Sequence, residues 1–282
     1  MVSRIPNDIF QFSTVSALMA GLCDSGPAAS QLTGYGTHGL GTCSSLNGEV
    51  LFLDSVPWHM TTSPLSGTAS PPSDQEALNS TARNLSPTIR HADPSSQLPF
   101  VQVTLFRPEF TLSLPLPSAN KSLTKSSLLS LLSSADPTRG SGGKNSFLPF
   151  QITGTFSKLD VRIGGPKQSS EEALSEVTAR APQWRLKRVR GTMFGILSPG
   201  WSQGISVAGF HGHFVEDEKA GEGEGGEVRR GGHVLDFEME VEAEGRVEWG
   251  VTGRYHLGMP RGEEWEGLDL SVDAEGIHRA EG

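Results

Sequence analysis

The sequence predicts an α+β fold, with a mixed β-sheet and a short helix in the N-terminal part and an antiparallel, strand-rich C-terminal part. Apolar and polar residues alternate with a period of two through much of the chain after residue 147. A strand-then-helix pattern opens the chain, and Ser- and Pro-rich stretches interrupt its first half. We therefore expect two parts: residues 1–146, with low-complexity inserts at 61–98 and 111–146, and residues 147–282.

The chain has 282 residues and a formal net charge of −9, which is unevenly distributed. From Glu216 onward it carries 19 acidic and 7 basic residues, and an acidic balance argues against nucleic acid binding through phosphate contacts. No run approaches the roughly 18 apolar residues of a transmembrane helix, and the start does not resemble a secretory signal. We therefore expect no membrane partner. Cys23 and Cys43 are too few for a disulfide framework, which fits a reducing compartment, so we expect a cytoplasmic protein.

Residues 9–22, IFQFSTVSALMAGL, predict the first two elements. Their start is typical of a short strand, and the apolar spacing that follows is typical of a helix. Ser13 or Thr14 provides the side-chain oxygen of an N-cap, and Gly21 stands where the helix is expected to end. The N-terminal part therefore begins with a strand and a short helix.

A glycine-rich stretch follows at residues 34–54. The glycines at 34, 36, 39 and 41 exclude a regular helix and indicate turns. The pair Asn47-Gly48 is typical of a hairpin turn, and residues 49–53 form an apolar run that predicts a buried strand. Alternation at residues 99–106 predicts another strand.

The two inserts have the composition of loops. Residues 61–98 are rich in Ser, Pro, Thr and Asn without a period, which is typical of a loop or a disordered segment. Within 111–146, the leucine pattern of residues 123–132 predicts a helix, and Asp136-Pro137 followed by glycines up to residue 143 ends it. We therefore expect a helix within the second insert.

From residue 147 the pattern changes to strands. Period-two segments cover residues 147–163, 184–197, 210–216 and 233–251, with prolines and glycines between them. Alternating strands punctuated by such residues are typical of an antiparallel sheet. The C-terminal part is therefore predicted to be mostly antiparallel sheet.

Three histidines in these strands form a candidate metal site. Because side chains at i and i+2 of a strand share a face, His211 and His213 project together. His233 opens the next strand and falls in register with its apolar residues Phe237 and Met239. A hairpin would bring the three imidazoles together, as in catalytic zinc sites with an open position, although histidines on an apolar face also occur as hydrogen-bonded core residues.

Several stretches, in order along most of the chain, resemble the α-acetolactate decarboxylase family. They are IFQFSTVSALMAGL (9–22), HGLGTCSSLNGE (38–49), LPFVQVTLFRP (98–108), ITGTFSKLDVR (152–162), LSEVTARAPQW (174–184), VRGTMFGILSPGWSQGISVAGFHGHF (189–214) and GGHVLDFE (231–238). The resemblance implies a zinc-dependent lyase that converts 2-acetolactate to acetoin and CO2 through a zinc-stabilised enediolate. It also implies a small-molecule substrate, and family members are commonly homodimers.

The resemblance also assigns site residues. The family's three zinc-binding histidines match His211, His213 and His233. Glu49 matches an acidic residue beside the metal, for which we expect proton handling with a pKa raised by burial. Arg162 matches an arginine that faces the substrate, and Thr42 matches a threonine that lines the site.

The family also brings a C-terminal glutamate to the metal, for which Glu281 is the candidate and Glu275 the alternative. Residues 35–43 depart from the family pattern, with Cys43 in the place of an aromatic residue, and the loop between His213 and His233 is long. Two alternatives stay open. One is a cupin-like metal-dependent oxygenase or isomerase, since Glu216 follows the His-x-His pair; the other is a non-catalytic relative.

Overall fold

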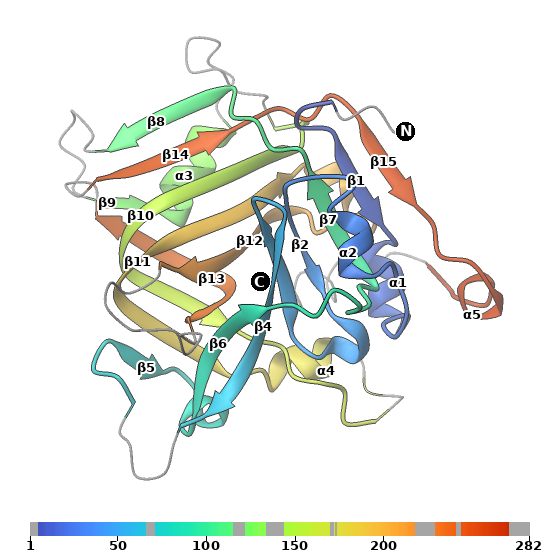
Figure 1. Ribbon diagram of the computed structural model, residues 1–282, viewed down its shortest axis with the longest axis horizontal. Coiled ribbons are helices and arrows are strands. Elements are labelled where there is room, and N and C mark those ends of the chain that lie inside the picture. Colours follow the sequence, from blue (N-terminus) through green and yellow to red (C-terminus); the bar gives the residue numbers. More distant parts are fainter. Residues whose placement is uncertain are drawn as a thin grey trace.

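A computed structural model shows two β-sheets and a few short helices, which confirms the predicted α+β class (Figure 1). The structure describes residues 5–65, 71–114, 122–133, 144–169, 172, 174–217, 229–240 and 244–270. The first sheet is mixed and the second is antiparallel, as expected.

The mixed sheet has seven strands, and only its edge pair, β1 with β15, is parallel. In spatial order the strands are β15 (Tyr255–Gly258), β1 (Ile9–Phe12), β7 (Phe100–Thr104), β2 (His38–Thr42), β3 (Glu49–Leu53), β4 (Val56–Pro64) and β6 (Leu85–His91). The buried strand predicted at 49–53 and the strand predicted within 99–106 are confirmed.

The antiparallel sheet has eight strands and is built around the long hairpin of β10 and β11. Its spatial order is β5 (Gln75–Ala77), β11 (Gln183–Ser198), β12 (Gly209–Glu216), β13 (Gly231–Glu240), β10 (Leu148–Arg162), β14 (Gly245–Trp249) and β8 (Phe110–Leu114), and β9 (Ser122–Thr124) pairs with β13. Each sheet contains strands from both sides of residue 147. Strand β15, which follows residue 147, belongs to the first sheet, whereas β5, β8 and β9, which precede it, belong to the second. The division at residue 146 stays a prediction.

The helices are short, and α3 lies against the antiparallel sheet, where its Leu128 and Leu132 join the main core (Figure 1). The α-helices are α1 (Val15–Met19), α2 (Ala29–Leu32), α3 (Lys125–Leu132), α4 (Leu174–Ala179) and α5 (Glu263–Glu266), with 3₁₀ turns at Ser44–Leu46, Ser80–Ala82 and Gly200–Ser202. Thr14 caps α1 by accepting from the Ala17 amide at 3.1 Å, so one of the two predicted caps is confirmed. Helix α3 confirms the helix predicted at 123–132, while its predicted terminator at 136–143 lies outside the described residues.

Two sequence-based expectations were wrong. The stretch 61–98 is not simply a loop, because residues 58–64 of β4 pair with β6 and bury Met60 against Ile89. Much of this edge of the sheet is only half-buried, so Ser and Thr occupy many of its positions and no alternation of apolar and polar residues is visible in the sequence. Gly39 and Gly41 lie inside β2 rather than in turns: a Cβ atom at Gly41 would meet the backbone of Phe100 and Val101 on β7, so the residue must be small.

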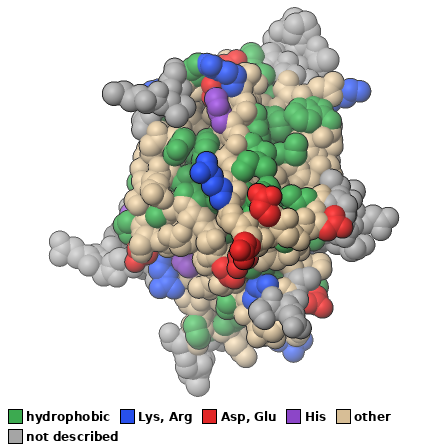
Figure 2. Space-filling model, turned by 90° about the vertical axis from the view of Figure 1, so that its right-hand side faces the viewer, with side chains coloured by type: hydrophobic (Ala, Val, Ile, Leu, Met, Phe, Trp, Pro, Cys, Tyr) green, Lys and Arg blue, Asp and Glu red, His purple; other side chains and the backbone are tan. Residues whose placement is uncertain are grey.

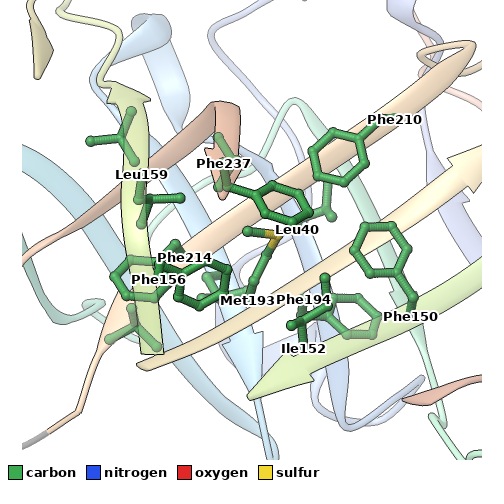
Figure 3. Close-up of a cluster of buried hydrophobic side chains, with 14 of the residues drawn as sticks. Leu40, Phe150, Ile152, Phe156, Leu159, Met193, Phe194, Phe210, Phe214 and Phe237 are labelled. Carbon is green, nitrogen blue, oxygen red and sulfur yellow. The ribbon is translucent and has the colours of Figure 1, made fainter. Parts of the chain in front are cut away.

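The main core contains side chains of both sheets, and its part on the antiparallel sheet carries a cluster of phenylalanine rings (Figure 3). Phe150 of β10 stacks on Phe210 of β12 with centroids 5.3 Å apart. Phe156 meets Phe214 edge to face at 5.3 Å and Phe237 at 5.8 Å. Such pairs contribute about 0.5–1.5 kcal/mol each beyond the area that they bury. This packing gives β10, β12 and β13 a fixed spacing.

The outer surface includes exposed apolar groups. Figure 2 shows the side on which β1, β15 and α1 lie in Figure 1, and hydrophobic side chains gather in its upper half. Trp201 and Met259 are among the exposed large apolar residues. Within the described residues, no helix has the length and apolar character needed to cross a membrane.

Candidate functional site

Two neighbouring strands of the antiparallel sheet bring the candidate histidines together. His211 and His213 share one face of β12, and His213 lies directly opposite His233 on β13. The three ring centroids are 5.1–5.3 Å apart, and all three side chains are buried. The predicted approach of the three imidazoles is therefore found.

The route by which His233 reaches this face differs from the expectation. β10 pairs Asp160 with Asp236 and Val161 with Val234, so one residue of β13, Leu235, has no partner and forms a bulge. The bulge reverses the alternation, and His233 lies on the face opposite Phe237. The prediction that His233 shares the face of Phe237 and Met239 was wrong for this reason.

The same register places Arg162 beside His233. The two residues are cross-strand partners at the end of β10, and Arg162 Nη2 lies 3.4 Å from His233 Nε2. Arg162 is buried, and its guanidinium stays charged at any ordinary pH. A fixed positive charge therefore lies next to the histidines.

Glu49 reaches the histidines from the other sheet. It is the first residue of β3, directly after Gly48, whose φ of 81° completes the predicted turn. Its Oε2 lies 2.7 Å from His213 Nε2 and 3.0 Å from His233 Nδ1. Candidate ligand atoms of these residues and His211 all lie within 4.8 Å of one another. The two sheets thus meet at a cluster of three imidazoles and one carboxylate.

The hydrogen bonds around the cluster leave one imidazole nitrogen without a partner. His213 Nδ1 donates to the Val50 carbonyl at 2.9 Å, and its Nε2 faces Glu49 Oε2 at 2.7 Å. His211 Nδ1 is buried without a hydrogen-bond partner. A buried nitrogen of this kind is costly unless it has a partner, and a cation among three imidazoles and a carboxylate would provide one, so the donor set fits a metal ion.

The electrostatics favour the protonation states that a metal requires. Burial lowers the pKa of His211 well below its ordinary value, and the neighbouring imidazoles lower it further. Burial and the charge of Arg162 lower the pKa of His233 to about 4. Burial alone would raise the pKa of Glu49, but His233 and His213 hold it well below its usual range, so the expected rise was wrong. Neutral imidazoles and an ionised carboxylate are the forms that bind a divalent cation.

A small pocket opens beside the cluster. Its polar wall consists of Thr42, Glu49, Arg162 and His211, and Thr42 lies opposite Glu49 in the β2–β3 hairpin. The other wall is largely apolar and includes Leu46, Phe100, Leu174, Val177 and Ala181. The pocket can accept a small molecule with one charged and one apolar side.

The structure therefore brings together six of the seven predicted site residues, while Glu281 and its alternative Glu275 lie outside the described residues. The apolar wall that α4 contributes to the pocket, which includes Leu174 and Val177, was not predicted from the sequence. The available signal was the stretch 174–184, which resembles the family although it contains no chemically reactive cluster.

Comparisons with known proteins agree on one family. The model of the family described as Alpha-acetolactate decarboxylase matches residues 9–272. The enzyme of that name from Methylococcus capsulatus is 28% identical over 276 residues, which cover 98% of this chain and 89% of the relative. The Lactococcus lactis subsp. cremoris enzyme is 28% identical over 267 residues, which cover 94% of each chain.

Solved structures show the same fold. The crystal structure of alpha-acetolactate decarboxylase from Bacillus subtilis strain 168 superposes with a TM-score of 0.75 at 24% identity and covers 98% of this chain and 99% of the other. A Staphylococcus aureus protein described as similar to the same enzyme gives a TM-score of 0.73 at 25% identity, with 98% and 100% covered. Because the family match extends over nearly its whole length, this chain belongs to the alpha-acetolactate decarboxylase family.

Proposed function

We propose that this protein converts 2-acetolactate to acetoin and CO2 at a zinc centre held by His211, His213 and His233, with Glu49 beside it. The observation that carries the proposal is the cluster itself, in which three buried imidazoles, one with a nitrogen that has no hydrogen-bond partner, lie beside an ionised carboxylate. Membership of the family supplies the substrate.

The ligand set supports zinc. Three neutral imidazoles with a position left open are typical of catalytic zinc sites. A bound zinc ion supplies Lewis acidity, which stabilises the negative charge that develops when CO2 leaves. The Val50 carbonyl fixes the His213 tautomer, as outer partners of metal-binding histidines commonly do.

Arg162 has the position and chemistry to orient the substrate. It lines the pocket beside His211, and its forked donors match the two oxygens of a carboxylate. Holding the substrate carboxylate in one orientation aligns the carbon–carbon bond that breaks with the adjacent ketone. Thr42, across the hairpin from Glu49, has a hydroxyl that can hold a substrate oxygen on the same side of the pocket.

Glu49 handles the proton in this proposal. Loss of CO2 leaves an enediolate, and its conversion to acetoin takes up one proton at carbon. Because its low pKa keeps Glu49 ionised, it acts first as a base that accepts the proton of the substrate hydroxyl group and then returns that proton to carbon, while the oxygen regains a proton from water. The contribution of Glu281, with Glu275 as its alternative, stays a prediction.

The cupin-like alternative loses its main support. Its glutamate after the His-x-His pair, Glu216, instead binds Arg230, with Oε1 2.6 Å from Arg230 Nη2. Arg230 also pairs with Asp74 at 2.8 Å, which anchors this end of β12 away from the cluster. Glu216 therefore has a structural partner and is not available as a ligand.

Product analysis tests the proposal. The purified, zinc-loaded protein is incubated with 2-acetolactate, and acetoin, CO2 and oxygen consumption are measured. We expect equal amounts of acetoin and CO2 without oxygen uptake, loss of both in His211→Ala, and no change in His91→Ala, whose exposed imidazole lies tilted against Trp58. Oxygen uptake would favour an oxygenase, and absence of acetoin from the loaded protein would favour a non-catalytic relative. The homodimer also stays a prediction, which the sedimentation coefficient of the protein tests.

A further inference from the structure

Described residues of the connection between β10 and β11 line the candidate pocket. The connection follows Arg162 directly, and Gly164, Thr178 and Ala181 are among its residues in the lining. Helix α4 lies in this connection, and its residues Leu174, Val177 and Thr178 line the pocket. The connection therefore forms part of the site.

Ion pairing and hydrogen bonds hold α4 in place. Arg180, just after the helix, binds Glu172 with Nε–Oε1 and Nη2–Oε2 distances of 2.7 and 2.9 Å, and it donates to the Pro166 carbonyl at 2.6 Å. The Lys167 amide donates to the Ser45 carbonyl at 3.1 Å, which ties the connection to the β2–β3 hairpin. The apolar wall thus has a defined position relative to Glu49.

The wall belongs to a small hydrophobic cluster that is separate from the main core. Val177 packs there with Leu46, Phe100 and Val207, and Leu174 packs against the edge of the cluster. Leu46, Phe100 and Val177 also line the pocket, so one side of this cluster faces the substrate position. A substrate with two methyl groups and one carboxylate would place its carboxylate at Arg162 and an alkyl group at this wall.

The two α4 side chains in this wall differ in burial. Val177 is almost fully buried among its neighbours, whereas Leu174 is half-buried. Because a buried side chain packed on several sides has little room to move aside, an alkyl group that reaches this wall is limited in length mainly by Val177.

We propose that Leu174 and Val177 of α4 determine which alkyl substituents the substrate carries, with Val177 as the principal size limit. This inference rests on the proposed function, because it concerns the same pocket and the same reaction. A hydrophobic pocket discriminates by about 10- to 200-fold per methylene, so shortening Val177 has a measurable effect on specificity.

The test compares 2-acetolactate with its two homologues, each of which has one methyl group replaced by ethyl. In Val177→Ala we expect the kcat/KM of one homologue, relative to 2-acetolactate, to rise by about tenfold or more. In Val177→Ile we expect the same ratio to fall, because the added methylene takes up space at the same place. This second variant also tests the proposal if Val177→Ala does not fold.

Val207→Ala is the matched control. Val207 is a buried valine of the same cluster, but it is not among the residues that line the pocket. We expect it to leave the substrate ratio unchanged even where it lowers stability. The assignment of Val177 as the size limit is overturned if both Val177 variants keep the wild-type substrate ratio, or if Val207→Ala shifts that ratio as much as they do. In either case, turnover of 2-acetolactate by the wild type leaves the proposed function standing. Absence of turnover of all three compounds by the zinc-loaded wild type overturns the proposed function and this inference with it.

Discussion

Replacement of Arg162 by lysine tests whether this side chain binds the substrate. Arg162 is buried at the end of β10, with Nη2 3.4 Å from His233 Nε2, and it forms part of the polar wall of the pocket. Lysine keeps the positive charge but has a single point of donation, so the paired hydrogen bonds to a carboxylate are lost. The change therefore separates charge from geometry.

The expected magnitude follows from the loss of one hydrogen bond to a charged group. Such a bond is worth roughly 1.5–3 kcal/mol, and about 1.36 kcal/mol corresponds to a tenfold change in rate. We expect Arg162→Lys to lower kcat/KM for 2-acetolactate by about 10- to 150-fold. Arg162→Met, which also removes the charge, should lower it further.

The assay is steady-state acetoin formation, with zinc content measured on the same samples. Arg185→Lys is the matched control, because Arg185 also forms a paired interaction, with Asp160 at 2.7 and 2.8 Å, but is not among the residues that line the pocket. We expect normal zinc content in both variants and normal activity in Arg185→Lys. The reasoning is refuted if Arg162→Lys keeps wild-type kcat/KM, or if Arg185→Lys loses as much.

Metal binding, thiol chemistry and pH dependence each give a further prediction. Loss of a residue that only hydrogen-bonds to a metal ligand typically weakens metal affinity roughly 10- to 100-fold, so His211→Ala, which removes a ligand, should weaken zinc binding by more than that. Equilibrium competition with a chelator measures the affinity, and an unchanged value would exclude His211 as a ligand. Burial and the charge of Glu49 raise the pKa of Cys43 to about 12, so a thiol reagent at pH 8 should label Cys43 only after unfolding, and rapid labelling of the native protein would contradict its burial. Hydrogen bonds from Arg180 and the Gln168 amide lower the pKa of Glu172 from 4.5 to about 2; the stabilisation they give is therefore complete above the unfolded value and is lost as the pH falls toward 2. The difference in melting temperature between wild type and Glu172→Gln should accordingly shrink between pH 4.5 and pH 2, and a difference that grows there would be the wrong sign.

The parts of the site that sequence could predict are those that depend on local geometry. Alternation along a strand places His211 and His213 on one face, and the Asn47-Gly48 turn places Glu49 at the start of a strand. The family resemblance adds His233 and Arg162 to the same set. These predictions need only the positions of residues within one element or within an aligned stretch.

The parts that sequence missed depend on contacts between elements. The bulge at Leu235 leaves no mark in the alternation of β13, yet it decides which face His233 occupies. The position of Glu49 against His213 depends on the meeting of two sheets, which no local pattern encodes. Likewise, Gly41 is read as a turn residue until the close approach of β7 becomes visible.

In the proposed reaction, the cluster of three histidines and Glu49 holds a metal on which decarboxylation depends. The most direct measurement is acetoin formation from 2-acetolactate by one protein sample before chelation, after complete removal of bound metal, and after addition of zinc. Four residues with candidate ligand atoms within 4.8 Å of one another predict full loss of turnover on removal and recovery at one zinc ion per chain. Undiminished turnover by the metal-free, folded protein would contradict the account.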